Sequence, residues 1–118
     1  MSQISLPEAA DLLSKLLSER VPLIGFFRSQ AGAEIRISGK VDSCTRANGL
    51  VVSVSGPPIE VERGYIRVRP FDKECVFLYG EKRELPEQFR DLADTYGEST
   101  LVLTFPAFKE ALALFFTI

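Results

Sequence analysis

Apolar residues recur at helical spacing near the start of the chain, at Leu6, Ala9, Leu13, Leu16 and Leu17. Ser5 followed three residues later by Glu8 forms a capping box, and Pro7 suits the first turn of a helix. Val21 and Pro22 end the pattern. The sequence therefore predicts an amphipathic N-terminal helix whose apolar stripe covers another element.

The region after this helix is typical of β-structure. Residues 23–28 are apolar and aromatic, and residues 29–32 break the run with small and polar side chains. Alternation then places Ile35, Ile37 and Val41 on one face of a strand. We expect these two segments to form neighbouring strands with one face towards the core.

Turn residues divide the rest of the β-region into short strands. Asn48-Gly49 marks one turn before an alternating segment. A two-residue turn at Arg63-Gly64 would place Glu62 opposite Tyr65, so that the apolar residues of both flanking strands share one face. Residues 75–79 supply a further strand.

The C-terminal third combines a second helix with β-structure. A helix is predicted over residues 86–96, with Gly97 at its end and an apolar stripe of Leu85, Phe89, Leu92, Ala93 and Tyr96. Residues 100–105 form a strand by β-propensity. Residues 107–118 have two interpretations: helical propensity in residues 109–114 favours a helix, whereas alternation favours a strand. We favour a strand that forms a hairpin with residues 100–105.

These elements predict a single α+β domain over residues 1–118. We expect an antiparallel twisted sheet or a small β-barrel, with the N-terminal helix and one helix near residues 86–96. The length of 118 residues suits one domain. Hydrophobic residues make up 46% and charged residues 25% of the chain, the composition of a globular protein.

Composition narrows the possible chemistry. The chain has no histidine, so the usual serine and cysteine triads and most zinc sites are excluded, and we predict no metal and no cofactor. Its net charge of −2 gives no general attraction to nucleic acid or to an anionic membrane. We therefore expect neither as a partner.

The two cysteines and the first residues indicate the compartment. Cys44 and Cys75 have no CxxC spacing and lie in or beside apolar stretches, so we expect reduced, packed thiols. Residues 1–13 lack the pattern of a signal peptide, and the longest apolar stretch, residues 111–118, is too short to cross a bilayer. The prediction is a cytoplasmic protein.

Basic residues supply a candidate site for an anionic small molecule. We place it around the mouth of the sheet, at Arg28, Arg36, Lys40 and Arg46. The alternative is a solvated sheet face on which nearby carboxylates neutralise these side chains.

An enzyme is the least favoured hypothesis, and no catalytic residue is assigned. Paired carboxylates occur at Glu60 and Glu62 and again at Asp72 and Glu74, in segments that look like surface. Cys44 would need activation by Lys40 or Arg46 alone.

The tail is apolar on both faces when it is treated as a strand. No charge occurs after Glu110, and a small domain rarely covers both faces of one sheet by itself. We therefore predict a homo-oligomer, in the simplest case a dimer, with an interface at Leu114, Phe115, Phe116 and Ile118. The alternative is a strand in the core.

Residues 39–54 read Gly-Lys-Val-Asp-Ser-Cys-Thr-Arg-Ala-Asn-Gly-Leu-Val-Val-Ser-Val, and residues 62–68 read Glu-Arg-Gly-Tyr-Ile-Arg-Val. This sequence pattern resembles that of PilZ domains, which are small β-barrels that bind cyclic di-GMP. When the family's Asp-x-Ser-x-x-Gly motif is aligned at Gly49, its aspartate and serine positions are occupied by Cys44 and Arg46. The upstream arginine pair of the family is missing as well, since Arg28 has no arginine four residues away. The resemblance implies the barrel without the family's ligand-binding residues.

Three hypotheses of function follow. The first is a non-catalytic cytoplasmic binding or interaction module that self-associates. The second is a PilZ-like or other domain that binds an anionic small molecule of nucleotide type. The third is an enzyme that depends on carboxylates or on Cys44.

Overall fold

One antiparallel sheet runs through the computed structural model, which describes residues 1–45, 49–54, 65–68, 75–95 and 97–118. Eight strands in these ranges pair in the order β1-β6-β7-β8-β2-β3-β4-β5. Their bounds are Ser2–Ile4 (β1), Leu23–Arg28 (β2), Glu34–Thr45 (β3), Gly49–Val54 (β4), Tyr65–Val68 (β5), Val76–Glu81 (β6), Ser99–Phe105 (β7) and Glu110–Phe116 (β8). β1 and β5 each have a single neighbour among these strands, so the sheet is open.

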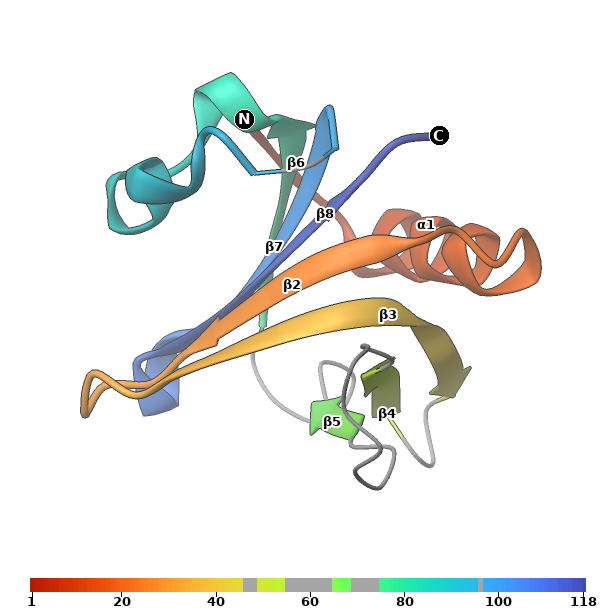
Figure 1. Cartoon of the computed structure of the whole chain (residues 1–118), viewed down its shortest axis with the longest axis horizontal. Coiled ribbons are helices and arrows are strands. Elements are labelled where there is room, and N and C mark those ends of the chain that lie inside the picture. The colour runs from red at the N-terminus through yellow and green to blue at the C-terminus, as the bar shows by residue number, and fades with distance from the viewer. Residues whose placement is uncertain (46–48, 55–64, 69–74, 96) are drawn as a thin grey trace.

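Helical segments cover both faces of the middle of the sheet. The α-helix α1 (Leu6–Ser18) packs on one face, and the 3₁₀ segments η1 (Lys82–Glu84) and η2 (Glu87–Leu92) lie on the other. Figure 1 shows α1 and these segments on opposite sides of β7, β8 and β2. The predicted α+β class is confirmed, and of its two forms the structure has the open twisted sheet.

The start of α1 follows the predicted capping box. The Glu8 amide donates to Ser5 Oγ over 3.3 Å, and the Ser5 amide donates to Glu8 Oε1 over 3.1 Å. Ser5 Oγ also donates to Glu8 Oε1 over 2.9 Å, and the hydrogen bonds that the Ser5 amide and hydroxyl donate to this carboxylate hold the pKa of Glu8 below its usual value. Ala9, Leu13 and Leu16 are buried, as the helical spacing predicts.

A Schellman motif ends α1. The Val21 amide donates to Leu16 O over 3.1 Å and the Arg20 amide to Leu17 O over 3.2 Å. This geometry places Arg20 in the left-handed region, at φ 50°, where glycine is the usual residue. Val21 is buried and turns the chain into β2.

β8 occupies the centre of the sheet, between β7 and β2. Phe105 pairs with Glu110 at the β7–β8 connection, so the strand interpretation of the tail and its hairpin are confirmed. Alternation sends Leu112, Leu114 and Phe116 into the α1-side core, a cluster that also contains Leu13, Leu16 and Phe77.

The opposite face of β8 enters a second core. Ala113 and Phe115 join Phe26, Phe89 and Val102 in this η2-side core. The rings of Phe26 and Phe115 meet edge to face, with centroids 6.1 Å apart. Both faces of β8 are therefore covered by the chain itself.

This double coverage corrects the predicted interface. Leu114, Phe115 and Phe116 are 0% exposed within one copy of the chain, so they offer no surface to a second copy. Of the four predicted interface residues, only Ile118 is exposed, at 51%. The expectation was wrong because Leu85 and the two buried residues of η2, Phe89 and Leu92, cover the second face.

The second helix has the predicted position but a different form. Leu85, Phe89 and Leu92 are buried as expected, but η2 is a 3₁₀ helix that ends at Leu92, and Ala93 is exposed. One cause is that the Gln88 carbonyl accepts a hydrogen bond from the Arg28 side chain, in competition with helical N–H groups. Tyr96 lies outside the described residues.

Gly97 has a role other than the predicted helix end. Its φ is 95°, and a Cβ at this position would lie 2.6 Å from the Phe116 nitrogen. Only glycine allows the chain to pass so close to the end of β8.

The remaining strand predictions are confirmed in part. Residues 23–28, 75–79 and 100–105 contribute to β2, β6 and β7. Ile37 and Val41 are buried, but Ile35 is 49% exposed near the β2–β3 turn. β5 pairs with β4, and the hairpin predicted at Arg63-Gly64 lies outside the described residues, as does Asn48.

Thr100 provides a test of the η2-side face. Its side chain is fully buried, and among the described residues its Oγ1 has no hydrogen-bond partner. Thr100→Val should raise the free energy of unfolding by about 1 kcal/mol, because it removes a buried unpaired hydroxyl at nearly constant volume. Urea unfolding measures the change.

Thr104 on the same strand and face is the matched control. It is only half-buried, so Thr104→Val should leave the stability within about 0.5 kcal/mol of the original. A loss of stability in Thr100→Val would contradict the assignment of an unpaired hydroxyl.

Candidate functional site

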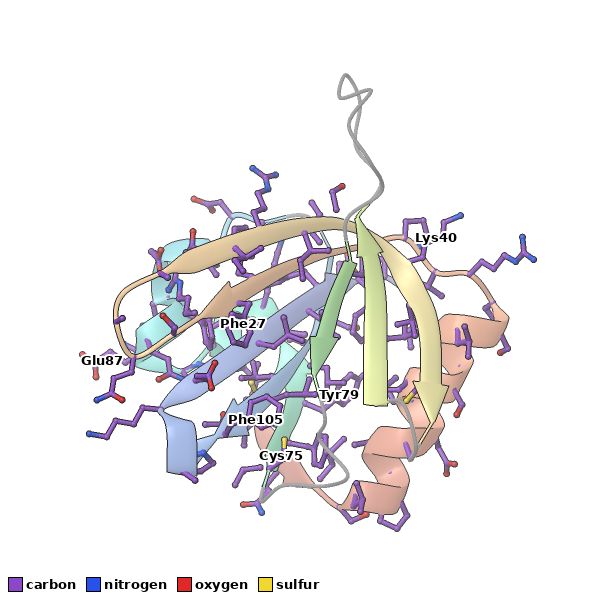
Figure 2. The ribbon with its side chains drawn as sticks, turned by 90° about the horizontal axis from the view of Figure 1, so that it is seen from below. Phe27, Lys40, Cys75, Tyr79, Glu87 and Phe105 are labelled. Carbon is purple, nitrogen blue, oxygen red and sulfur yellow. The ribbon has the colours of Figure 1, made fainter. Side chains whose placement is uncertain are left out.

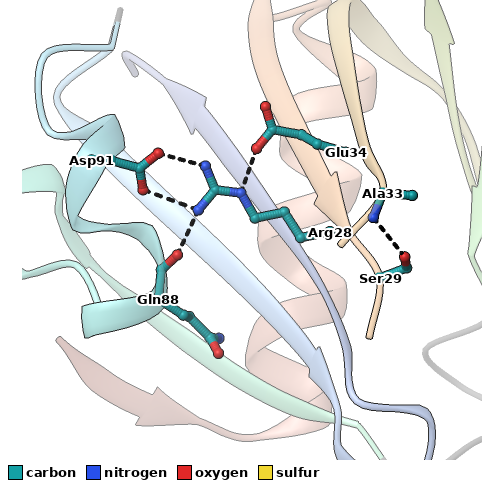
Figure 3. A network of polar contacts seen from close by, with 6 residues as sticks. All are labelled: Arg28, Ser29, Ala33, Glu34, Gln88 and Asp91. Atoms are coloured by element: carbon teal, nitrogen blue, oxygen red, sulfur yellow. Dashed lines mark hydrogen bonds and ion pairs between the residues drawn. The ribbon is translucent and has the colours of Figure 1, made fainter. Parts of the chain in front are cut away.

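Arg28, the last residue of β2, joins two parts of the chain that are far apart in sequence. Its Nε donates to Glu34 Oε2 on β3. Nη1 donates to Gln88 O over 2.5 Å and to Asp91 Oδ1 over 3.0 Å, and Nη2 donates to Asp91 Oδ2 over 2.7 Å. Figure 3 shows this network between the β2–β3 hairpin and η2.

The sheet register explains why the network forms. Arg28 pairs with Glu34 across β2 and β3, so the two side chains emerge side by side on the η2-side face. The guanidinium carbon lies 5.2 Å from the centroid of Phe89, a buried residue of η2. Ion pair, hydrogen bonds and ring contact together fix η2 on the sheet.

The charge of Arg28 is balanced within this network. Hydrogen bonding to Asp91 and then to Glu34 raises the pKa of Arg28, although burial opposes the rise. The same hydrogen bond from Arg28 holds the pKa of Asp91 below its usual value. With two carboxylates bound, Arg28 acts as a clamp and has little capacity for an added anion.

The other predicted basic residues do not gather around Arg28. The Arg36 guanidinium lies over Phe26, 5.7 Å from the ring centroid. Lys40 is four residues farther along β3, roughly 13 Å away for an extended strand. Figure 2 shows Lys40 and Glu87, the first residue of η2, on opposite sides of the molecule. Arg46 lies outside the described residues, so the predicted four-residue cluster is not assembled by the described part of the chain.

A cavity of about 410 Å³ opens beside the clamp. Its base is a row across three strands, in which Arg28 pairs with Ala111 and Ala111 pairs with Thr104. The small side chain of Ala111 between two longer ones leaves a hollow, and Gln88 and Phe89 of η2 form one wall.

Two residues of opposite charge line the cavity at the β7–β8 connection. This connection is the 3₁₀ segment η3 (Pro106–Phe108), closed by Lys109 in the left-handed region at φ 50°. The Lys109 amide donates to Pro106 O over 3.2 Å, which sets Lys109 and Glu110 at the start of β8. Both residues line the cavity, as does Pro106.

Several of the side chains that line this cavity have no polar partner in the described part of the chain. Neither Lys109 nor Glu110 forms an ion pair there, and the side chains of Thr104 and Gln88 form no hydrogen bond. Sequence reasoning missed these residues because each looks like ordinary surface. The one available signal was a Lys-Glu pair at the turn of a hairpin whose strands are otherwise apolar.

The two cysteines are poor candidates for nucleophiles. Both are free thiols, half-buried against the α1-side core, as expected for packed thiols. Burial raises the pKa of Cys44, and it raises the pKa of Cys75 to about 12. Thiolate is the reactive form, so at neutral pH both thiols are largely unreactive.

The alternative carboxylate pairs, at Glu60 with Glu62 and Asp72 with Glu74, lie outside the described residues. Within the described ranges, no group of three or more cysteine, aspartate or glutamate side chains is arranged to hold a metal ion. No helix in the described part of the chain is long and apolar enough to cross a membrane.

Comparison of the chain with protein-family models, with curated proteins and with solved structures gave no match. The resemblance to PilZ domains therefore depends on the sequence pattern alone. Function has to be argued from the clamp and the cavity.

The clamp predicts a pH-dependent effect of Asp91→Asn. The pKa of Asp91 in the folded state lies below its ordinary value of 3.8. The ionised carboxylate therefore stabilises the fold at neutral pH, and this stabilisation is lost as the pH falls through the lowered pKa. Asp91→Asn should lower the urea midpoint at neutral pH, and the difference should shrink at a pH well below 3.8.

Asp94→Asn is the control, since Asp94 is exposed and forms no ion pair with the described residues. Its urea midpoint should follow that of the original protein at both pH values. An Asp91→Asn effect that is equal at neutral and acidic pH would rule out the ion pair as its cause.

Proposed function

We propose that this chain is a non-catalytic binding module that takes a small polar molecule into the cavity beside Arg28. The observation that carries the proposal is a cavity whose lysine, threonine and glutamine side chains have no partners among the described residues. Its volume of about 410 Å³ lies within the roughly 300–1,000 Å³ of sites for small organic ligands. Phe89, Ala111 and Pro106 supply apolar walls.

The chemistry of the cavity favours binding over catalysis. Glu110 is the only acidic residue among those that line it, and the alternation of β8 turns its side chain towards the α1-side face with that of Phe105, so it is poorly placed as a general acid or base for a molecule in the cavity. Arg28 lines the cavity but is held by Glu34 and Asp91. The unreactive thiols fit the same proposal, and free thiols fit a cytoplasmic location.

A titration followed by NMR tests the binding function. The probes are acetate, phosphate, methylammonium and glycine, which cover an anion, a polyanion, a cation and a zwitterion. At least one should shift the amide signals of Thr104, Lys109 and Ala111 in a saturable manner. Ala111→Leu should abolish the shifts, because the longer side chain fills the hollow.

Ala93→Leu makes the same substitution at an exposed site away from the cavity and should bind as the original does. If Ala111→Leu does not fold, Thr104→Leu fills the hollow from the neighbouring strand. The proposal fails if no probe shifts these amides, or if the filled cavity binds as well as the open one.

Self-association has a different possible surface. Because the tail is buried, the free edge of β5 is the alternative: β4 is its only partner among the described strands. Tyr65, Ile66 and Val68 favour β-structure, and an edge strand can pair with the same strand of a second copy. We propose this edge as the dimer contact.

Sedimentation velocity over a range of concentrations tests the edge. The N–H groups of neighbouring residues in a strand point in opposite directions. One of the two variants Ile66→Pro and Arg67→Pro therefore removes an N–H group from the free edge of β5 and leaves the hydrogen bonds to β4 intact. The variant that keeps its thermal stability should sediment as a monomer while the original sediments as a dimer. A monomeric original protein at every concentration would refute self-association.

A further inference from the structure

We infer that the molecule bound in the cavity is a small organic carboxylate, in which a single carboxylate group is attached to a short apolar body. This inference rests on the proposed binding function. It names the class of ligand, which the volume of the cavity leaves open.

No carboxylate of the described residues is placed to face a molecule in the cavity. Glu110 pairs with Phe105, whose side chain lies in the α1-side core, so strand alternation turns the Glu110 side chain away from the cavity. Glu34 and Asp91 bind the guanidinium of Arg28 and do not line the cavity. A ligand with an ammonium group would therefore find no counter-ion in the described part of the chain.

Lys109 supplies the one positive charge that remains for a ligand among the described residues that line the cavity. Arg28 lines it too, but its guanidinium is taken by two carboxylates and by the Gln88 carbonyl. Lys109 is exposed and has no ion-pair partner among the described residues. A single ammonium balances a single negative charge, so a monoanion suits the cavity better than a cation or a dianion.

The Thr104 hydroxyl supplies a second hydrogen-bond donor. Thr104 pairs with Ala111 across β7 and β8, and Ala111 belongs to the η2-side core, so both side chains point to the face on which the cavity lies. The Thr104 side chain is half-buried and forms no hydrogen bond with the described residues. A carboxylate has two acceptor oxygens, of which one can accept from Lys109 and the other from Thr104.

The remaining walls suit the apolar body of the ligand. Phe89 and Ala111 are buried in the η2-side core and line the cavity together with Pro106. An organic carboxylate can bury its hydrocarbon part against these walls while its charged group is directed towards the exposed Lys109. Inorganic phosphate has no apolar part to bury, so it gains nothing from this side of the cavity.

Titrations of matched probes, followed by NMR at the amides of Thr104 and Ala111, test the inference. Butyrate carries a carboxylate and an apolar chain, butyramide replaces the charge by a neutral amide, and butylammonium reverses the charge. We expect butyrate to bind at least about tenfold more tightly than either, because only butyrate forms a charge-assisted hydrogen bond with Lys109. It should also bind about tenfold more tightly than acetate, which has two fewer methylene groups to bury.

Lys109→Gly tests the charged contact. Glycine adopts a φ of 50° readily, so the variant keeps the turn and should weaken butyrate about tenfold while leaving butyramide unchanged. Arg20→Gly is the matched control, because it removes the same charge at the same φ of 50° but lies at the end of α1 and outside the cavity. It should bind butyrate as the original does.

Thr104→Val tests the hydroxyl. The variant keeps the volume of the side chain, and it should weaken butyrate at least about fivefold because one carboxylate oxygen loses its donor. Thr100→Val is the matched control, since it removes a hydroxyl from the same strand and face but does not line the cavity. It should bind butyrate as the original does.

The outcomes separate this inference from the function on which it rests. If phosphate, methylammonium or butylammonium saturates the cavity and butyrate binds no better, the binding function stands and the carboxylate is wrong. Equal binding of butyrate and butyramide, or full butyrate affinity in Lys109→Gly or in Thr104→Val, overturns the inference too. If no probe affects the cavity, both proposals fail.

Discussion

The burial of β8 on both faces is the constraint on which this fold depends. A strand with leucine and phenylalanine on one side and alanine and phenylalanine on the other requires a layer on each side of the sheet. α1 provides one layer through Ala9, Leu13 and Leu16. The other is built from Phe89 and Leu92 of the 3₁₀ segment η2 and from Leu85 just before it. In the described part of the chain, only Ile35 and Ile118 remain as exposed large apolar side chains.

The thin second layer explains the importance of Arg28. Six residues of 3₁₀ helix form few stable backbone hydrogen bonds of their own, so η2 needs support from the sheet. Arg28 supplies it by binding Asp91 and the Gln88 carbonyl while Glu34 holds the guanidinium in place. Arg28, Ala111 and Thr104 lie in one row across β2, β8 and β7. The same strand register therefore positions both the clamp and the cavity.

Much of the fold could be predicted from sequence because its signals are local. The capping box at Ser5 and Glu8, the alternation of the tail and the buried positions of α1 all depend on residues within a few positions of one another. The form of η2 could not be predicted, since it depends on a hydrogen bond from Arg28, 60 residues away. The burial of Phe115 could not be predicted either, because the residues that cover it, such as Phe89, are distant in the sequence.

The site was less predictable than the fold. Arg28 was selected as an anion ligand because it is basic, but sequence does not reveal that Asp91 will neutralise it. Arg36 lies over Phe26 of the η2-side core, whereas Lys40 is four residues farther along β3. Lys109 and Thr104 became candidates only when the fold placed them around one hollow.

The pairing of β2 with β8 also determines how the chain can fold. Leu23 lies beside Phe116, so the centre of the sheet joins segments from opposite ends of the sequence. During synthesis β2 emerges well before its partner β8, because residues 29–109 lie between the two strands. Contacts of such long range slow folding, and they leave the apolar edge of β2 exposed in the nascent chain. We therefore expect the ribosome-bound protein to depend on chaperones until β8 is released.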